Sequence, residues 1–469
     1  MTLPFGPFPT SLSNAIQTNY LERLFIDSLR PVLVYRHIAD REVFEGRIGQ
    51  SITKTRMGLM VPNITPLNPA TNTNLDNGLT AQNYSDEQYT LSIAQYPQLA
   101  PDINLPDDEL TIASFAMRNA VNLGIAQATC LDSLIRNALF NAYMGGQTVV
   151  TATLGAPGTT IAVDDTRGFQ TTVVNGNVVP VSGTNTLSVS VNGTTYLLSG
   201  FANDVSNVSS AAITGGTSGT LTFTTNVSVL NGTLGNKVLA ANAPAIIRPN
   251  NRASTNLIQS TDLLNMQSIL AGVAYLRNNA VPTVNGRYNL YLTATSMNGL
   301  FADPEFQILT RGVGTRDPDY AEAWVYEFLD VRFIQTTQAF VQPPQATAVA
   351  VAQTIQRPIL CGQGCVVESI FKRGMDAIKN TAEKGTVGDV NNLIAMNNPF
   401  NINVFNREAL MDGFYMYVRH PLDRLGQILS QTSNYIGGFV VPTDVTTTPT
   451  IIPTASNSAY KRSVIFETA

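Results

Sequence analysis

Residues 106–146, PDDELTIASFAMRNAVNLGIAQATCLDSLIRNALFNAYMGG, form the stretch that decides the fold. Asp107 and Asp108 stand where carboxylates cap the N–H groups of a helix start, and Gly145 and Gly146 can end the helix in a left-handed turn. A helix of roughly 38 residues would be about 55 Å long. Its apolar residues recur at steps of three and four, which predicts one apolar face that needs a large partner surface: Leu110, Ala113, Met117, Ala120, Val121, Ala128, Leu131, Leu134, Ile135, Ala138, Leu139 and Ala142.

Few charges interrupt this predicted helix. From residue 110 onward only Arg118, Asp132 and Arg136 are charged, and all three are candidates for contacts with neighbouring subunits. Asp132 and Arg136 are four residues apart, so they form a weak pair if exposed, or they reach a neighbouring chain. Gly124 weakens the helix by about 1 kcal/mol relative to Ala, and we expect a bend or a close crossing there.

The composition is poor in charge. Among 469 residues, 13% are charged and 44% are hydrophobic, and the net charge is −5, whereas charged residues usually make up about 25%. Such a chain lies outside the cell or covers much of its surface with other copies of itself. Without a basic patch, tight binding of DNA or RNA is not expected.

Targeting signals are missing from the sequence. The first residues, MTLPFGPFPTSLSN, lack a basic and an apolar signal region, and no apolar run reaches about 18 residues. The three cysteines make no disulfide framework. We therefore expect no membrane insertion and no cleaved secretion signal, and folding in a reducing cytoplasm.

Residues 1–46 are expected to form an N-terminal arm, with an amphipathic helix over 13–29 that stops before Pro31. A cluster of both signs follows. It predicts ion pairs across a subunit boundary, and a solvated face is an equal alternative. The cluster consists of Arg36, Asp40, Arg41, Glu42, Glu45 and Arg47.

Residues 47–105 have β-rich segments at 51–61 and 89–97 around a middle rich in Pro, Asn and Thr. This pattern predicts a long projecting hairpin.

The next change of composition comes after the long helix, where residues 147–250 are rich in Thr, Val, Ser, Asn and Gly. This segment predicts an inserted all-β domain, a sandwich or a small barrel, with two-residue hairpin turns at Asn175-Gly176, Asn192-Gly193 and Asn231-Gly232.

Residues 251–436 return to mixed helix and strand patterns. We expect a helix of about 17 residues that begins after a cap at 260–262, a strand at 288–292, a strand pair at 324–328 and 331–336, and a helix near 367–383. Residues 437–469 are predicted to be a tail with a last strand at 461–466.

Catalytic and metal-binding signals are weak. The two histidines, His37 and His420, belong to no recognised catalytic motif, and Cys361 and Cys365 lack further nearby ligands for zinc. The adjacent acids Asp164 and Asp165 are most simply turn residues. We predict no enzyme activity, no cofactor and no metal site.

The order of these elements resembles the major capsid proteins of tailed bacteriophages with the HK97-like fold. The likeness covers the chain except for 147–250 and about the last 30 residues. It is carried by the following segments: 29–34 (LRPVLV), 89–93 (YTLSI) through Tyr96 to Asp107, 128–135 (ATCLDSLI), 288–292 (YNLYL) with Leu300 and 303–306 (DPEF), 327–336 (EFLDVRFIQT) and 421–427 (PLDRLGQ).

The resemblance implies an α+β capsid fold. In it, 1–46 would be the N-arm, 47–105 the E-loop, 106–146 the spine helix of the P-domain, and 251–436 the A-domain with the rest of the P-domain, while 147–250 would be an extra all-β insertion domain. Copies would assemble into hexamers and pentamers of an icosahedral head around double-stranded DNA. Implied partners are a portal protein, a scaffolding function and possible decoration proteins, with DNA held by weak non-specific contact only.

The resemblance also places the chain in the virion, after synthesis and assembly in the host cytoplasm. Some relatives crosslink their subunits through an E-loop lysine, and Lys54 lies in the corresponding hairpin. Monomer bands alone on a denaturing gel of mature particles would refute such a crosslink. The alternative from another class is an extracellular lattice or adhesin-like structural protein, which the Thr- and Asn-rich β segment favours.

Overall fold

The computed structural model describes part of the chain. It comprises residues 33–45, 51–57, 64, 86–104, 115–174, 177–204, 216–312, 327–328, 330–344, 353–372, 403–405, 414–419, 428–442 and 461–469. The chain divides into two compact units. The first consists of 1–52, 91–137 and 366–440, and the second of 53–90, 138–365 and 441–469.

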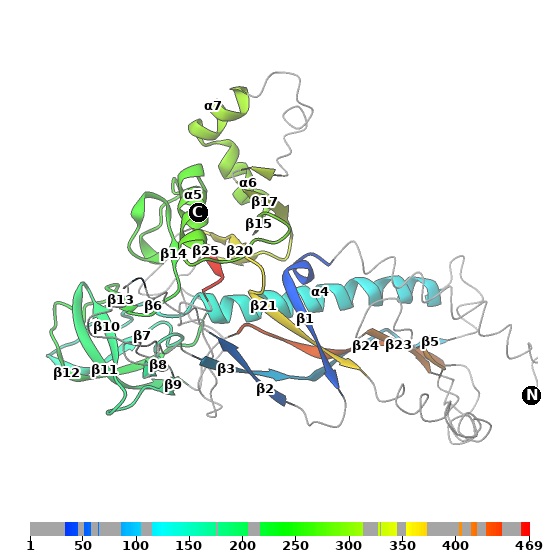
Figure 1. Ribbon diagram of the computed structural model, residues 1–469, viewed down its shortest axis with the longest axis horizontal. Helices are drawn as coiled ribbons and strands as arrows, with labels where there is room; N and C mark the ends of the chain where they lie inside the picture. The colour runs from blue at the N-terminus through cyan, green and yellow to red at the C-terminus, as the bar shows by residue number, and fades with distance from the viewer. Residues whose placement is uncertain are drawn as a thin grey trace, which may run out of the picture. The chain divides into compact units, whose positions relative to one another are not determined.

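The first unit is built on a long helix and a seven-stranded sheet (Figure 1). Helix α4 (Phe115–Tyr143) has 29 residues. The sheet has the order β1-β21-β24-β23-β22, with β4 and β5 also paired to β24. β1 runs parallel to β21, and the other pairs are antiparallel. The strands are β1 (Ala39–Glu45), β4 (Ala94–Leu99), β5 (Ile103–Asn104), β21 (Val366–Lys372), β22 (Asn403–Phe405), β23 (Phe414–Arg419) and β24 (Ile428–Val440).

Helix α4 packs on this sheet through small and aliphatic side chains. Ala120, Leu123, Ala128 and Leu131 form one buried cluster with Tyr435 of β24 and with residues that flank the helix and sheet. Alanine lets the helix approach closely, and burial of apolar area supplies about 25 cal/mol per Å². The predicted apolar stripe is therefore confirmed at these alanines and at Leu131.

Three details of the predicted helix are not confirmed. Met117 is 44% exposed, although it belongs to the predicted stripe. The helix continues through the buried Gly124 without a break, and the bend or close crossing expected there stays a prediction. The predicted caps Asp107 and Asp108 lie outside the described residues.

The second unit contains a six-stranded sheet that closes on itself. Its order is β6-β13-β10-β11-β12-β7, and an antiparallel bridge between Val150 and Val163 joins the last strand to the first. A small barrel results, with a core of its own, and closure removes exposed sheet edges. The strands are β6 (Gln147–Val149), β7 (Gly158–Val163), β10 (Leu187–Val191), β11 (Thr194–Asn203), β12 (Gly219–Val227) and β13 (Lys237–Ala240).

The turns of this segment test the hairpin signals. Asn192 and Gly193 have φ of 49° and 83° between the paired strands β10 and β11, which confirms the hairpin predicted at these two residues. β8 (Thr171–Val174) and β9 (Asn177–Pro180) pair across a two-residue connection, as 175–176 predicts. The prediction at 231–232 is wrong, because β12 and β13 pair with other strands and not with each other.

The same unit holds a second six-stranded sheet, ordered β14-β25-β20-β15-β17-β16. The C-terminal strand β25 lies inside it, between β14 and β20. Its members are β14 (Ile246–Ile247), β15 (Tyr288–Leu292), β16 (Glu327–Phe328), β17 (Val331–Gln335), β20 (Ile359–Cys361) and β25 (Ser463–Phe466), and α5 (Met266–Asn278), α6 (Ala294–Phe301) and α7 (Pro304–Gly312) accompany them. The predicted last strand and the predicted pair around Asp330, which has φ of 61°, are confirmed.

The start of helix α5 differs from the prediction. Its N-cap is Asn265, whose Oδ1 accepts the N–H of Ser268 at 2.9 Å. Asp262 lies upstream and accepts the N–H of Gln259 instead. Both side chains can cap a helix, but the Asp262 carboxylate already accepts from Asn250, Arg252 and the Gln259 N–H.

Two more strand pairs lie among the described residues. β2 (Ser51–Met57) pairs with β3 (Asp86–Ser92), so the strands of the predicted hairpin are present. β18 (Phe340–Gln342) pairs with β19 (Ile355–Arg357). The helix predicted near 367–383 is wrong at its start, because β21 occupies Val366–Lys372, and its remainder lies outside the described residues.

Candidate functional site

Asp132 joins the long helix to the N-terminal segment of the first unit. Its side chain is fully buried, and its carboxylate accepts the N–H of Val34 at 3.0 Å and that of Tyr35 at 3.2 Å. These N–H groups open the short 3₁₀-helix η2 (Tyr35–Ile38), whose own N-cap, Val34, provides no side-chain oxygen. Asp132 therefore caps η2 from a distant part of the chain.

The charge state of Asp132 reflects two opposed effects. Burial raises the pKa of its carboxyl from 3.8 to about 6, and the hydrogen bonds from Val34 and Tyr35 act in the opposite direction. Burial dominates because the ionised carboxylate loses its hydration.

A buried ion pair lies beside the same segment. The guanidinium of Arg36 pairs with Glu368 of β21 at 2.7 Å, with side chains 3% and 0% exposed. The hydroxyl of Tyr435 donates to Glu368 Oε1 at 2.9 Å, and Arg41, half-exposed, lies 3.6 Å from Oε2. The Arg36 guanidinium also lies 5.1 Å from the ring centroid of Phe414. This arrangement ties η2 and β1 to the centre of the sheet.

The residues predicted at subunit contacts fall into different environments. Arg36 and Asp132 are buried among partners in their own chain, which the sequence pattern did not indicate. Arg136 donates to Asn137 Oδ1 at 3.1 Å. Of the others, Arg41 and Arg118 are exposed, Asp40, Glu42 and Lys54 are half-buried, Glu45 lies on β1, and Arg47 is outside the described residues.

The second unit holds a carboxylate shared by two arginines. Glu467, fully buried, accepts from Arg248 Nε at 2.7 Å and from Arg357 Nε at 3.2 Å, and the hydroxyl of Thr255 donates to it at 2.8 Å. Burial raises the pKa of Glu467, but the charges of Arg248 and Arg357 outweigh it, so the net shift is downward. This cluster fixes the residues after the C-terminal strand.

Another buried pair joins the end of α4 to the barrel segment. Arg167 pairs with Asp165 at 2.7 Å, with side chains 3% and 1% exposed, and its Nη1 donates to Asn141 Oδ1 at 3.1 Å. Asp165 was expected to be a simple turn residue. The structure gives it a second role, because its carboxylate neutralises a buried guanidinium.

Glu368 and Glu467 were not singled out from the sequence. Each is a lone acid in a short apolar run, CVVESIFK and SVIFETA. A carboxylate in a buried strand needs a cationic partner, and this signal would have found both residues. Their arginine partners are more than a hundred positions away and leave no local pattern.

The cysteines and histidines form no reactive arrangement in the described residues. Cys361 and Cys365 are buried free thiols, and burial raises the pKa of Cys361. His37 is exposed, and His420 lies outside the described residues. Within the described part, no group of three or more His, Cys, Asp or Glu could hold a metal ion, and no helix has the length and apolarity needed to cross a membrane.

Comparison with solved structures finds phage capsids. The chain is similar to the capsid of cyanophage P-SCSP1u, with 11% identity over 93% of this chain and 88% of that chain and a TM-score of 0.43. It is also similar to the capsid of Helicobacter pylori bacteriophage KHP30 (9% identity, 91% and 87% coverage, TM-score 0.45) and of cyanophage Pam1 (10% identity, 100% and 99% coverage, TM-score 0.44). No family model matches the sequence, and no curated protein matches it.

Proposed function

We propose that this chain is the major capsid protein of a tailed bacteriophage, with an HK97-like fold. The observation that carries the proposal is the 29-residue helix α4, packed along a sheet whose strands come from the segments before it and from the far end of the chain. Together with the strand pair β2-β3 that precedes the helix, this is the arrangement that the sequence resemblance implies for an E-loop and a P-domain.

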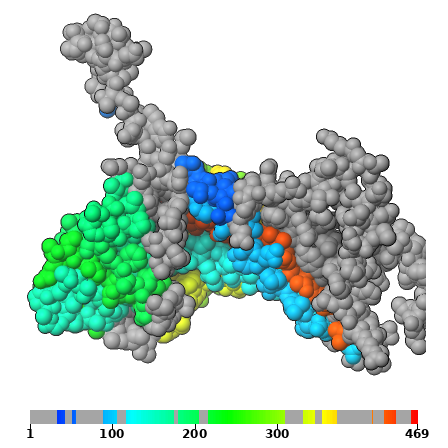
Figure 2. All heavy atoms as spheres, turned by 90° about the horizontal axis from the view of Figure 1, so that it is seen from below, coloured from blue at the N-terminus to red at the C-terminus, as the bar shows by residue number. Residues whose placement is uncertain are grey.

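The surface composition supports assembly from many copies. Only 13% of the residues are charged, and several of these charges lie in buried ion pairs such as Arg36–Glu368. On the sheet of the first unit, Leu99 is 71% exposed and Ile428 45% exposed, and atoms of β4 and β24 form adjoining bands on the surface in Figure 2. Exposed apolar residues on a charge-poor surface favour contact with other copies.

In this role, copies form hexamers and pentamers that close into an icosahedral head around double-stranded DNA. A portal protein, a scaffolding function and decoration proteins are the partners, and the chain acts in the virion as a structural protein after assembly in the host cytoplasm. With a net charge of −5, the wall holds its DNA by weak non-specific contact only. In this role, the exposed and half-buried residues among the predicted subunit-contact charges lie at contacts between copies.

Electron microscopy of the expressed full-length chain tests the proposal. Closed particles or rings of five or six subunits are expected. Flat sheets would favour the alternative of an extracellular lattice protein, and a soluble monomer under all assembly conditions would contradict both.

The segment 147–250 is proposed to lie on the outside of the shell, as a brace or decoration. The closed barrel supports this role, because its strands all come from one continuous stretch and it has its own core. Deletion of 148–249 with a short linker should leave assembly possible but lower the temperature at which shells dissociate. Unchanged shell stability would refute the brace.

A further inference from the structure

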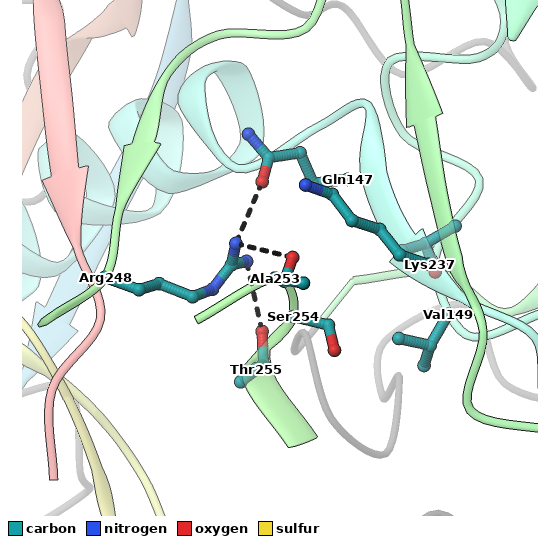
Figure 3. Close-up of a pocket in the computed structure, with 8 residues that line it drawn as sticks. Gln147, Val149, Lys237, Arg248, Ala253, Ser254 and Thr255 are labelled. Atoms are coloured by element: carbon teal, nitrogen blue, oxygen red, sulfur yellow. Dashed lines mark hydrogen bonds between the residues drawn. The ribbon is translucent and has the colours of Figure 1, made fainter. Parts of the chain in front are cut away.

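A small pocket lies where the barrel strands β6 and β13 meet the chain that leaves the barrel. It is lined by Gln147, Thr148, Val149, Lys237, Arg248, Ala253, Ser254 and Thr255. Figure 3 shows the side chains of Lys237 and Arg248 reaching in from opposite sides toward Gln147. Two of the eight lining residues are cationic and none is acidic.

Arg248 is held in place by contacts on three sides. Its Nε donates to Glu467, its Nη1 to Gln147 Oε1 at 3.2 Å and to the carbonyl of Ala253 at 3.3 Å, and its Nη2 to Thr255 at 3.5 Å. The guanidinium is therefore rigid, and one N–H of Nη2 remains for a further acceptor.

Cationic side chains gather around Arg248. Arg248 shares the carboxylate of Glu467 with Arg357. Lys237 adds a third cation. Burial lowers the pKa of its ammonium group, and the charge of Arg248 lowers it further. Among the described residues, no hydrogen-bond acceptor or anion reaches the Lys237 ammonium group. Like charges in a partly buried site repel strongly, and a bound anion would remove this cost.

The dimensions of the pocket limit what can enter. The cavity has a volume of about 10 Å³, which is room for one water-sized group. A single oxygen atom of a larger anion has about this size, so the rest of such an anion would stay outside the cavity.

We propose that Lys237 and Arg248 bind a small inorganic oxyanion of the phosphate class, one oxygen of which enters this pocket. The anion joins strand β13 to the residues that follow β14 and lies against the charges of Lys237 and Arg248. This site is independent of the proposed function, because every residue in it belongs to one chain.

Titration calorimetry with sodium phosphate tests the site on the soluble full-length chain at constant ionic strength. We expect saturable binding of one phosphate per chain. Lys237→Met should bind at least about tenfold more weakly, and Lys237→Arg, which keeps the cation, should bind within a fewfold of wild type. Lys461→Met is the matched control, because burial also lowers the pKa of Lys461 but this lysine does not line the pocket, and it should bind like wild type.

Circular dichroism of each variant verifies that it is folded. Absence of saturable phosphate binding in the wild type would overturn the proposal, as would equal binding by Lys237→Met and the control. Chloride that binds as tightly as phosphate would overturn the assignment to oxyanions. None of these outcomes bears on whether the chain forms shells.

Discussion

Asp132 should make the first unit more stable as the pH falls below neutral, which is the opposite of the usual behaviour of a paired carboxylate. Its pKa of about 6 in the folded chain lies above the unfolded value of 3.8. The folded state therefore binds the proton more tightly, and the free energy of unfolding rises as the pH falls from about 6 toward 3.8. The full effect is about 3 kcal/mol, because each unit of pKa shift corresponds to about 1.4 kcal/mol.

Asp132→Asn removes this titration and keeps one oxygen that can accept the N–H groups of Val34 and Tyr35. The measurement is the urea dependence of far-ultraviolet circular dichroism on the unassembled chain at pH 7.5, 6 and 5. The difference in unfolding free energy, wild type minus variant, should grow by about 1 kcal/mol in favour of the wild type between pH 7.5 and 5.

Asp132→Ala is the matched second variant. It should show the same pH trend relative to wild type, with an added loss of about 1 to 3 kcal/mol per unpaired buried N–H group. A difference that stays flat with pH, or that shrinks as the pH falls, would refute the reasoning, because it would mean that the two N–H groups outweigh burial and hold the carboxylate ionised.

Three other predictions concern buried contacts. Glu467→Gln should cost about 3 to 5 kcal/mol in the free energy of unfolding, since it leaves two buried guanidinium groups without their carboxylate. Because folding lowers the pKa of Glu467 from 4.5, the advantage of the wild type should decline as the pH falls below 4.5 toward the lower pKa of the folded state. An advantage that grows in acid would contradict this. Gly272→Ala places a Cβ 2.6 Å from Phe466 Cζ, so we expect the free energy of unfolding to fall by about 1 to 3 kcal/mol and the melting temperature to fall with it. An unchanged melting temperature would mean that the C-terminal strand can shift. Arg36→Met should cost about 3 to 5 kcal/mol and Arg41→Met, the half-exposed control on the same carboxylate, about 1 kcal/mol or less; equal losses in urea unfolding would contradict the buried pair.

Local pattern in the sequence was sufficient for several elements. The apolar stripe predicts α4, because a helix repeats every 3.6 residues and its burial depends on its own spacing. The hairpin at Asn192-Gly193 follows from the left-handed backbone that these two residues accept. The prediction of a small barrel or sandwich for the Thr- and Asn-rich segment is likewise local in origin.

Tertiary structure alone decided the features that depend on distant partners. A helix is predicted near 367–383, but pairing with β1 and β24 makes Val366–Lys372 strand β21. The last strand, β25, lies between β14 and β20, a position that its own residues do not encode. Asp132 and Glu467 acquire their partners only when segments about a hundred or more positions apart are buried together. Burial then makes each unpaired charge or N–H group costly, so the partner is chosen by the folded surroundings and not by spacing along the chain.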